Sequence, residues 1–379
     1  MTNNDAELYV HIPFCERKCA YCDFLSFPAG EDTKAKYVNA LKHEIAAASG
    51  AFKGKIIRSV FFGGGTPTVL QKEFTAEILN MLFRAFMIRK DAEITIECNP
   101  GTSDREKLEY LRNAGFNRIS IGAQSFDDAK LREIGRIHDQ AAIYRCVDDA
   151  KEAGFRNINI DLISALPYQT LEDWTLDLKK AAALKPQHIS AYSLILEEGT
   201  PLYENSGGLE FPDEDTERRM YYLTGEILSE YGYSQYEISN YALPGFESIH
   251  NSGYWTGVPY LGLGLGASSF TGNVRYKNTS DMNEYLENAA CPEKQRKDIE
   301  ELSKQDLESE FMITGLRMTK GVSLEEFRRR FKEELKEVFE APMKKHLKTG
   351  HLIEENGWIR LSGEAVSVSN TILADFLLE

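Results

Sequence analysis

The chain has 379 residues, of which 42% are hydrophobic, so it can bury the core of one large domain and a smaller one. Its net charge of −15 and pI near 5.1 argue against nucleic acid or an anionic membrane surface as the main partner. No apolar run approaches the roughly 18 residues of a membrane span, and the polar start of the chain excludes a signal peptide. We therefore expect a cytoplasmic protein with reduced thiols and no transmembrane segment, and leave peripheral membrane association open.

Strand-like and helix-like stretches alternate from residue 7 to about residue 196. The strand-like runs cover residues 8–12, 57–62, 93–97, 118–122, 157–163 and 188–196. The amphipathic stretches between them cover residues 33–49, 71–87, 104–114, 140–153 and 171–184. Several runs are almost continuously apolar, which is typical of a parallel sheet covered by helices on its faces. Six such units are too few to close an eight-stranded barrel. The sequence therefore predicts an α/β fold, a partial (β/α)6 barrel over residues 1–200.

The alternation is lost after residue 200, and two further parts are predicted. Residues 201–298 carry a helix near 213–231 and a segment rich in glycine and aromatics, which we expect to complete the barrel and face its ligand. Residues 299–379 are expected to form a small α+β domain of winged-helix shape. Its predicted elements are helices near 303–318, 323–332 and 334–349, a hairpin over 352–361 that turns at Asn356-Gly357, and a helix near 363–378.

Three of the six cysteines, Cys15, Cys19 and Cys22, lie within eight residues in the spacing C-x3-C-x2-C. Thiolates are soft ligands that suit zinc and iron–sulfur clusters. A structural zinc site needs four ligands, and no fourth cysteine or nearby histidine completes this set. Three thiolates can instead hold three irons of a [4Fe-4S] cluster and leave the fourth iron open to a chelating ligand. A disulfide would require an oxidising compartment, and a chance cluster of buried cysteines is the remaining alternative.

Further candidate residues lie where the predicted parallel strands end. The second strand runs into Gly63-Gly64-Gly65-Thr66-Pro67, in which missing side chains let the backbone approach a ligand closely. Glu97, Gln124 and Asp161 lie at or near the ends of the third, fourth and fifth strands. Arg136 follows the fourth strand and offers two parallel donors to a carboxylate. Carboxyl ends of parallel strands meet at one edge, so these groups are expected to line one site.

The cysteine motif, with Tyr21 just before its last cysteine, resembles the signature of the radical S-adenosylmethionine (SAM) superfamily. The resemblance implies the same partial barrel, with SAM chelated by the open iron and cleaved by the reduced cluster to a 5′-deoxyadenosyl radical. The segment Tyr9-Val-His-Ile-Pro-Phe-Cys15 narrows the resemblance to one branch of the superfamily, that of oxygen-independent coproporphyrinogen III oxidases and HemW-type heme chaperones. The resemblance places these residues at SAM: Tyr9, Tyr21, Gly64, Gly65, Thr66, Glu97, Gln124, Arg136, Asp161 and Ile195.

A second motif, H-N-x-x-Y-W over residues 250–255, resembles the one that distinguishes the heme chaperones from the oxidases. It implies a heme site made by His250, Asn251, Tyr254 and Trp255. Imidazole is a common axial ligand of heme iron, and the two aromatic rings could stack on a porphyrin face. A loop histidine that is merely solvated or hydrogen-bonded is the alternative.

Two departures from the oxidases concern substrate turnover. The oxidases continue the motif with a fourth cysteine where this chain has Phe24, and they carry an N-terminal extension, whereas the first cysteine here is already residue 15. We therefore expect a heme chaperone that delivers heme to apo-hemoproteins, respiratory ones among the candidates, without coproporphyrinogen dehydrogenase activity. The alternatives are the oxidase itself and a radical SAM enzyme with an unrelated substrate. Catalytic residues and homodimer formation are left open.

Overall fold

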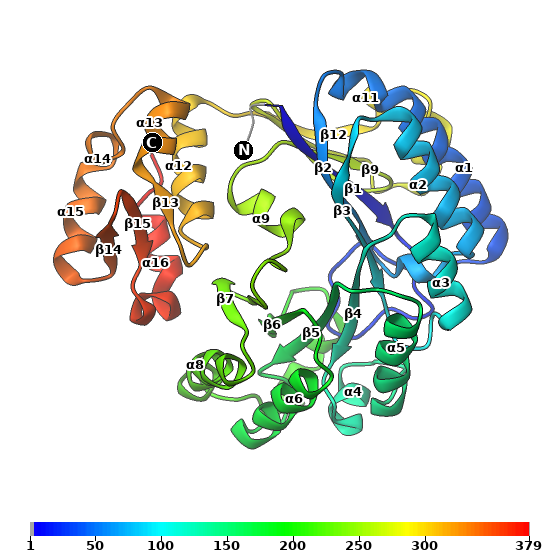
Figure 1. The fold of residues 1–379 in the computed structure, drawn as a ribbon, viewed down its shortest axis with the longest axis horizontal. Coiled ribbons are helices and arrows are strands. Elements are labelled where there is room, and N and C mark those ends of the chain that lie inside the picture. The colour runs from blue at the N-terminus through cyan, green and yellow to red at the C-terminus, as the bar shows by residue number, and fades with distance from the viewer. Residues whose placement is uncertain (1–3, 379) are drawn as a thin grey trace.

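A computed structural model describes residues 4–378, and a sheet of twelve strands dominates it (Figure 1). Six strands lie parallel and side by side in chain order. They are β1 (Asp5–Ile12), β2 (Ile56–Gly64), β3 (Ile88–Cys98), β4 (Arg118–Gln124), β5 (Ile158–Ser164) and β6 (His188–Ser193). This arrangement confirms the predicted α/β fold with a partial barrel.

Five helices cover the outer face of these strands (Figure 1). They are α1 (Glu31–Ala48), α2 (Lys72–Ala85), α3 (Arg105–Ala114), α5 (Gln140–Glu152) and α6 (Leu171–Ala183), close to the predicted ranges. Side-chain caps mark where α5 and α6 begin: Asp139 accepts a hydrogen bond from the Ala142 amide, and Thr170 forms a capping box with Asp173. A short helix, α4 (Asp128–Glu133), was not predicted.

The segment after residue 200 extends the sheet at both edges. Beside β6 lie β8 (Asn240–Ala242) and β7 (Ser234–Glu237), which follow α7 (Pro201–Glu204) and α8 (Glu214–Glu230). Beside β1 lie β9 (Tyr260–Leu263), β10 (Ser268–Thr271), β11 (Val274–Asn278) and β12 (Arg296–Glu301), with α10 (Met282–Asn288) and α11 (Pro292–Gln295) between the last two. The sequence analysis predicted helix α8 here but none of these strands. Strand β9 pairs with β1 in parallel, although about 250 residues separate them.

Helix α9 (Ile249–Trp255) lies on the inner side of the sheet, against β2, and opposite the outer helices (Figure 1). The side chain of Ser248 caps this helix by accepting from the Asn251 amide. This placement brings the predicted heme motif into the barrel.

The C-terminal region has a three-stranded antiparallel sheet of β13 (Val322–Ser323), β15 (Trp358–Leu361) and β14 (Leu352–Glu355). The hairpin turns at Asn356-Gly357, as predicted, because both residues have positive φ. The helices are α12 (Lys304–Gly315), α13 (Leu324–Phe331), α14 (Leu335–Val338), α15 (Glu340–Thr349) and α16 (Ser369–Ala374). The helix predicted over 334–349 is interrupted at Phe339, whose ring is buried beside Phe327 and Phe376. The final predicted helix is a 3-10 helix (Gly363–Val368) followed by α16.

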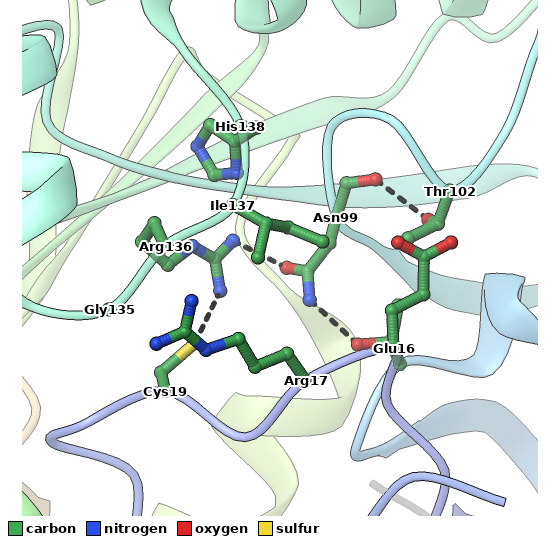
Figure 2. A pocket seen from close by; sticks show the side chains of 10 residues that line it. Glu16, Arg17, Cys19, Asn99, Thr102, Gly135, Arg136, Ile137 and His138 are labelled. Carbon is green, nitrogen blue, oxygen red and sulfur yellow. Dashed lines mark hydrogen bonds between the residues drawn. The ribbon is translucent and has the colours of Figure 1, made fainter.

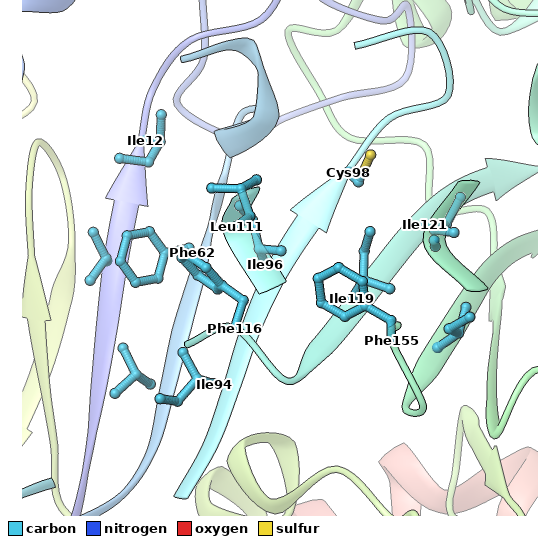
Figure 3. Packing of buried hydrophobic residues seen from close by; sticks show 14 of the residues in the cluster. Ile12, Phe62, Ile94, Ile96, Cys98, Leu111, Phe116, Ile119, Ile121 and Phe155 are labelled. Carbon is cyan, nitrogen blue, oxygen red and sulfur yellow. The ribbon is translucent and has the colours of Figure 1, made fainter. Parts of the chain in front are cut away.

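Two large apolar cores hold the chain together, one between the barrel strands and their outer helices and one in the C-terminal region. Figure 3 shows the barrel core, in which Ile12, Phe62, Ile96 and Ile119 project from neighbouring strands. The predicted domain boundaries after residues 200 and 298 stay predictions. None of the helices within residues 4–378 is long and apolar enough to cross a membrane.

A buried carboxyl group joins the outer helix layer to the added strands. Glu44 of α1 accepts hydrogen bonds from the Gly264 amide at 2.8 Å, Asn278 Nδ2 at 2.7 Å and the Tyr285 hydroxyl at 2.6 Å. Burial raises the pKa of Glu44 to about 7, although these three donors oppose the shift. The anchor is therefore most stable with Glu44 protonated.

Replacing Glu44 with Gln tests this anchor. The folded-state pKa lies above the ordinary value of 4.5, so the wild type loses stability as pH rises through about 7. Between about pH 5.5 and 8 its free energy of unfolding should fall by about 2 kcal/mol relative to E44Q, from 1.36 kcal/mol per pKa unit. Urea unfolding of both proteins across this range measures the difference, and a difference that does not change with pH would contradict the anchor.

Candidate functional site

A cavity of about 540 Å³ runs from the carboxyl ends of the parallel strands into the barrel interior. It brings together nearly all the residues that the sequence singled out, from β1 to α9. They are Tyr9, Cys15, Cys19, Tyr21, Cys22, Gly64, Gly65, Thr66, Glu97, Gln124, Arg136, Asp161, Ile195, His250, Asn251 and Tyr254. One cavity therefore contains both the cysteine motif and most of the predicted heme motif.

The cysteine loop is held against the glycine turn by backbone hydrogen bonds. The Gly65 amide donates to Ile12 O at 2.8 Å, and the Thr66 amide donates to Phe14 O at 2.8 Å. A Cβ atom at Gly65 would lie 2.6 Å from Phe14 O, and one at Gly64, whose φ is +108°, would lie 2.4 Å from the His11 ring. The glycines are thus required for close approach to the chain leading into Cys15, besides lining the cavity.

A buried arginine connects this turn to the cysteines (Figure 2). Arg136 donates from Nη1 to Cys19 Sγ at 3.4 Å and from Nη2 to Asn99 Oδ1 at 2.7 Å and to the Gly122 carbonyl at 2.5 Å. Asn99 in turn donates to Thr66 Oγ1 at 2.6 Å, which lies 3.5 Å from Cys15 Sγ. Arg136 and Asn99 thus fix two of the three thiols relative to each other.

Arg136 retains one donor for a ligand. Its Nε is buried and has no hydrogen-bond partner within residues 4–378. An unpaired buried donor is costly, so a bound acceptor would be favoured beside it. A carboxylate is the natural partner of a guanidinium group.

The six cysteines are all free thiols. Cys15, Cys19 and Cys22 are each partly exposed on the cavity side. Among the described residues, no three or more His, Cys, Asp or Glu side chains lie close enough together to hold a single metal ion. Ligands of a [4Fe-4S] cluster each bind a different iron, so three sulfurs spread along one cavity wall fit such a cluster as a donor set.

Two carboxyl groups line the cavity from β3 and β5, the strands on either side of β4. Burial and the charge of Asp161 raise the pKa of Glu97 to about 8. Burial also raises the pKa of Asp161, whose oxygens accept from Ser120 Oγ at 2.9 Å and Asn159 Nδ2 at 2.7 Å. Paired acids in a closed space provide acceptors and exchangeable protons for a polar ligand.

A tyrosine–histidine pair stiffens the wall formed by β1. His11 Nε2 lies 2.9 Å from the Leu25 carbonyl, which can only accept, so the ring carries its proton on Nε2. Nδ1 then accepts from the Tyr9 hydroxyl at 3.0 Å. Burial lowers the pKa of His11, which keeps the ring neutral.

Three other lining residues have distinct settings. Gln124 adopts a φ of +67°, an uncommon conformation for a residue with a side chain, where β4 ends. Phe24 and Ile195 line the cavity but are 70% and 68% exposed, so they form an apolar rim at its mouth.

His250 lies deep in the inner wall, with 1% of its surface exposed. Its Nδ1 is 2.9 Å from Ser59 Oγ, its Nε2 is 3.0 Å from the Tyr254 hydroxyl, and Phe61 stacks on its ring at 5.0 Å. Burial lowers the pKa of His250 to about 3, helped by the charge of Arg58. The imidazole is therefore neutral at physiological pH, as ligation of a metal requires.

The side chains of Glu7 and Arg58 lie behind this histidine. Glu7 Oε1 accepts from Arg58 Nε at 2.8 Å, while Glu7 Oε2 lies 3.7 Å from His250 Nδ1. The amides of Ile249 and His250 donate to Glu93 at 3.1 Å. These contacts hold the first turn of α9 against the strands.

Trp255 lies outside the residues that line the cavity. The guanidinium of Arg317 stacks on its ring at 4.5 Å from the centroid. As the structure stands, Trp255 ties α9 to the C-terminal region.

Several further residues that line the cavity belong to no motif in the sequence. Arg118, Ser120, Asn159 and Ser190 project inward from within the strands, and Asn99 follows β3. Polar residues at alternate positions of otherwise apolar strands are the signal that could have identified the first four.

NMR of histidine-labelled, cluster-free protein tests the environment of His250. Since burial lowers its pKa to about 3, its ring signals should stay constant from about pH 8 to pH 5, while solvent-exposed imidazoles titrate near pH 6.5. His250→Gln assigns the signal. Titration of this ring between pH 6 and 7 would contradict the buried position.

Comparisons with known proteins agree with this geometry. Residues 9–181 match the Radical SAM superfamily, and residues 302–368 match the HemN C-terminal domain. The solved structure of coproporphyrinogen III oxidase (HemN) from Escherichia coli, a radical SAM enzyme, has a TM-score of 0.86 to this chain at 25% identity. That likeness covers 99% of this chain and 90% of the other.

Two curated relatives span nearly the full length. The chain is 36% identical over 373 residues to the heme chaperone HemW of Lactococcus lactis subsp. lactis, covering 98% of this chain and 97% of that protein. It is 34% identical over 374 residues to the heme chaperone HemW of Bacillus subtilis, covering 98% and 99%. The chain therefore belongs to the radical SAM superfamily and, within it, to the family of HemW heme chaperones.

Proposed function

We propose that this protein is a heme chaperone that binds a [4Fe-4S] cluster, SAM and heme, and delivers heme to apo-hemoproteins. The observation that carries the proposal is that the cysteine motif and His250 line the same cavity. The names of the relatives support the same assignment. We place this activity in the cytoplasm, with respiratory hemoproteins among the candidate acceptors.

The residues around Cys15, Cys19 and Cys22 fit the cluster. Thr66 lies within hydrogen-bond reach of Cys15 Sγ, and Arg136 donates to Cys19 Sγ, so two of the three sulfurs have polar partners that would stabilise bound thiolates. When bound and reduced, such a cluster supplies one-electron reduction of SAM. The protein's own contribution is to hold the three sulfurs on one loop and leave the fourth iron open.

The residues next to the cysteines fit SAM. The unpaired Nε of Arg136 would donate to a carboxylate, and Glu97 and Asp161 offer acceptors for an ammonium group or ribose hydroxyls. The backbone of Gly64 and Gly65 closes the same wall. Tyr9, Tyr21, Thr66, Gln124 and Ile195 complete the proposed SAM contacts.

The proposed heme site uses His250, Asn251 and Tyr254, with Phe24 and Ile195 as an apolar rim. A neutral imidazole can bind heme iron through Nε2, provided that the Tyr254 hydroxyl moves away from that atom. The Ser59 hydroxyl at Nδ1 would then orient the ring. Trp255 enters the site only if α9 moves away from Arg317.

The second candidate function is that of the oxidase, which the fold favours. Phe24 counts against it, because a 70% exposed phenylalanine stands where the oxidases have a cysteine. Conversion of coproporphyrinogen III by the reconstituted protein with SAM and a reductant would favour the oxidase over the chaperone.

Arg136→Lys tests the hold on the cysteine loop. Lysine keeps the charge but cannot bridge Cys19, Asn99 and Gly122 at once. Cluster iron should pass to a ferrous chelator about tenfold faster, as is usual when a partner of a metal ligand is lost. Arg132→Lys, at an exposed position of α4, is the matched control, and equal rates in both variants would contradict this role.

An anaerobic heme titration that follows the Soret band tests His250. His250→Ala should weaken binding at least about tenfold and shift the spectrum, because an axial ligand is lost. Tyr254→Phe keeps the ring and frees Nε2, so binding should tighten by up to about fivefold, the equivalent of one hydrogen bond. His43→Ala, at an exposed position of α1, is the matched control.

The result that would contradict this site is equally specific. Identical spectra for the wild type and His250→Ala would leave His250 as a structural residue, and the oxidase would become the leading candidate. Weaker binding by Tyr254→Phe would instead show that its hydroxyl contacts heme rather than competing with it.

A further inference from the structure

Two cysteines outside the cluster motif lie next to each other in the barrel wall. Cys98 is the last residue of β3, and Cys146 lies in the middle of α5, which belongs to the outer helix layer. Their Sγ atoms are 3.8 Å apart, and both side chains are 2% exposed. In the sequence neither cysteine belongs to a motif, and 47 residues lie between them. Figure 3 shows Cys98 at the end of its strand, at the margin of the apolar core.

The surroundings of Cys98 are more polar than packing alone needs. Its Sγ lies 3.0 Å from Ser103 Oγ and 3.7 Å from the Asn99 carbonyl. The loop that carries these groups is exposed at Gly101 and Asp104, so Cys98 lies just beneath a surface loop. Cys146 is one of the buried residues of α5.

The contact between the two thiols shifts their pKa values in opposite directions. The hydrogen bond with Cys146 lowers the pKa of Cys98 to about 7, and the hydroxyl of Ser103 adds to the effect against the cost of burial. The same contact raises the pKa of Cys146 well above its ordinary value, with burial adding to the shift. Cys98 is therefore the nucleophile of the pair, and Cys146 is the resolving thiol.

We propose that Cys98 and Cys146 form an oxidation-sensitive dithiol, which hydrogen peroxide converts into a disulfide. The Cys98 thiolate attacks one peroxide oxygen, the O–O bond breaks, and hydroxide leaves with the electron pair, giving a sulfenic acid. Cys146 then attacks that sulfur, the S–O bond breaks, and water leaves. Overall, two thiols and one peroxide give one disulfide and two waters. The sulfurs need to approach from 3.8 Å to about 2.05 Å.

This oxidation would act on the neighbouring site. Asn99, the next residue in the chain, connects Arg136 to Thr66 and thereby Cys19 to Cys15. Drawing Cys98 toward α5 removes its sulfur from Ser103 and pulls on the end of β3. The disulfide would thus loosen the support of the cysteine loop. The inference concerns thiols outside the loop and does not rest on the proposed function.

Peptide mapping of the cluster-loaded protein tests the pair. The protein is treated anaerobically with increasing peroxide, quenched in acid, alkylated and digested with trypsin, which releases Cys98 in residues 91–105 and Cys146 in residues 146–151. We expect these two peptides to be linked by a disulfide at peroxide levels too low to oxidise Cys291, which is then still alkylated. Dithiothreitol should separate them.

Three variants sharpen the outcome. Cys291→Ser should leave the link unchanged, since Cys291 is partly exposed and lies just before α11, away from the pair. Cys146→Ser and Cys98→Ser should each abolish it. In the wild type, the proposal is overturned if Cys98 and Cys146 are both still alkylated at peroxide levels that oxidise Cys291. It is also overturned if Cys98 forms its disulfide with a cysteine of the cluster motif instead. The wild-type map alone decides this if a variant fails to fold.

Discussion

The site depends on the close backbone contact between the cysteine loop and the glycine turn after β2. Amides of Gly65 and Thr66 donate to the carbonyls of Ile12 and Phe14, and a side chain at Gly65 would collide with them. This contact sets where the loop leaves the barrel, and therefore where its sulfurs lie. Arg136 and Asn99 then connect the loop to the third and fourth strands.

The parallel sheet supplies the second constraint. Because β1 to β6 run in one direction, their carboxyl ends present Glu97, Gln124 and Asp161 to one cavity. The same arrangement leaves the inner face of the sheet open, and α9 occupies part of it. His250 thus reaches the site from a segment more than 225 residues after the cysteines, and its neutral ring depends on burial against Ser59 and Phe61.

Much of the fold could be predicted from the sequence because the central strands are apolar runs and each helix is amphipathic. The later strands could not be predicted in the same way. Strand β9 is short and contains Gly262, and β12 is almost wholly polar, so their pairing depends on distant partners rather than on local pattern. The interruption at Phe339 likewise follows from packing in the C-terminal core.

The site could be predicted in part for a similar reason. Strand-end residues follow from the geometry of parallel sheets, whereas side-chain networks depend on the exact positions of atoms. No local pattern indicates that Arg136 donates to Cys19 and Asn99, or that the Tyr254 hydroxyl forms a hydrogen bond with the histidine of its own motif. The adjacency of Cys98 and Cys146 likewise became visible only in the folded chain.

The central claim is that heme binds in the cavity that contains the cysteine loop. An anaerobic crystal structure of the cluster-loaded protein with heme measures this directly. The account predicts heme iron on His250 Nε2, with the porphyrin between α9 and the rim formed by Phe24 and Ile195. Heme bound on the outer helices or on the C-terminal region, with His250 still hydrogen-bonded to Tyr254, would contradict this claim.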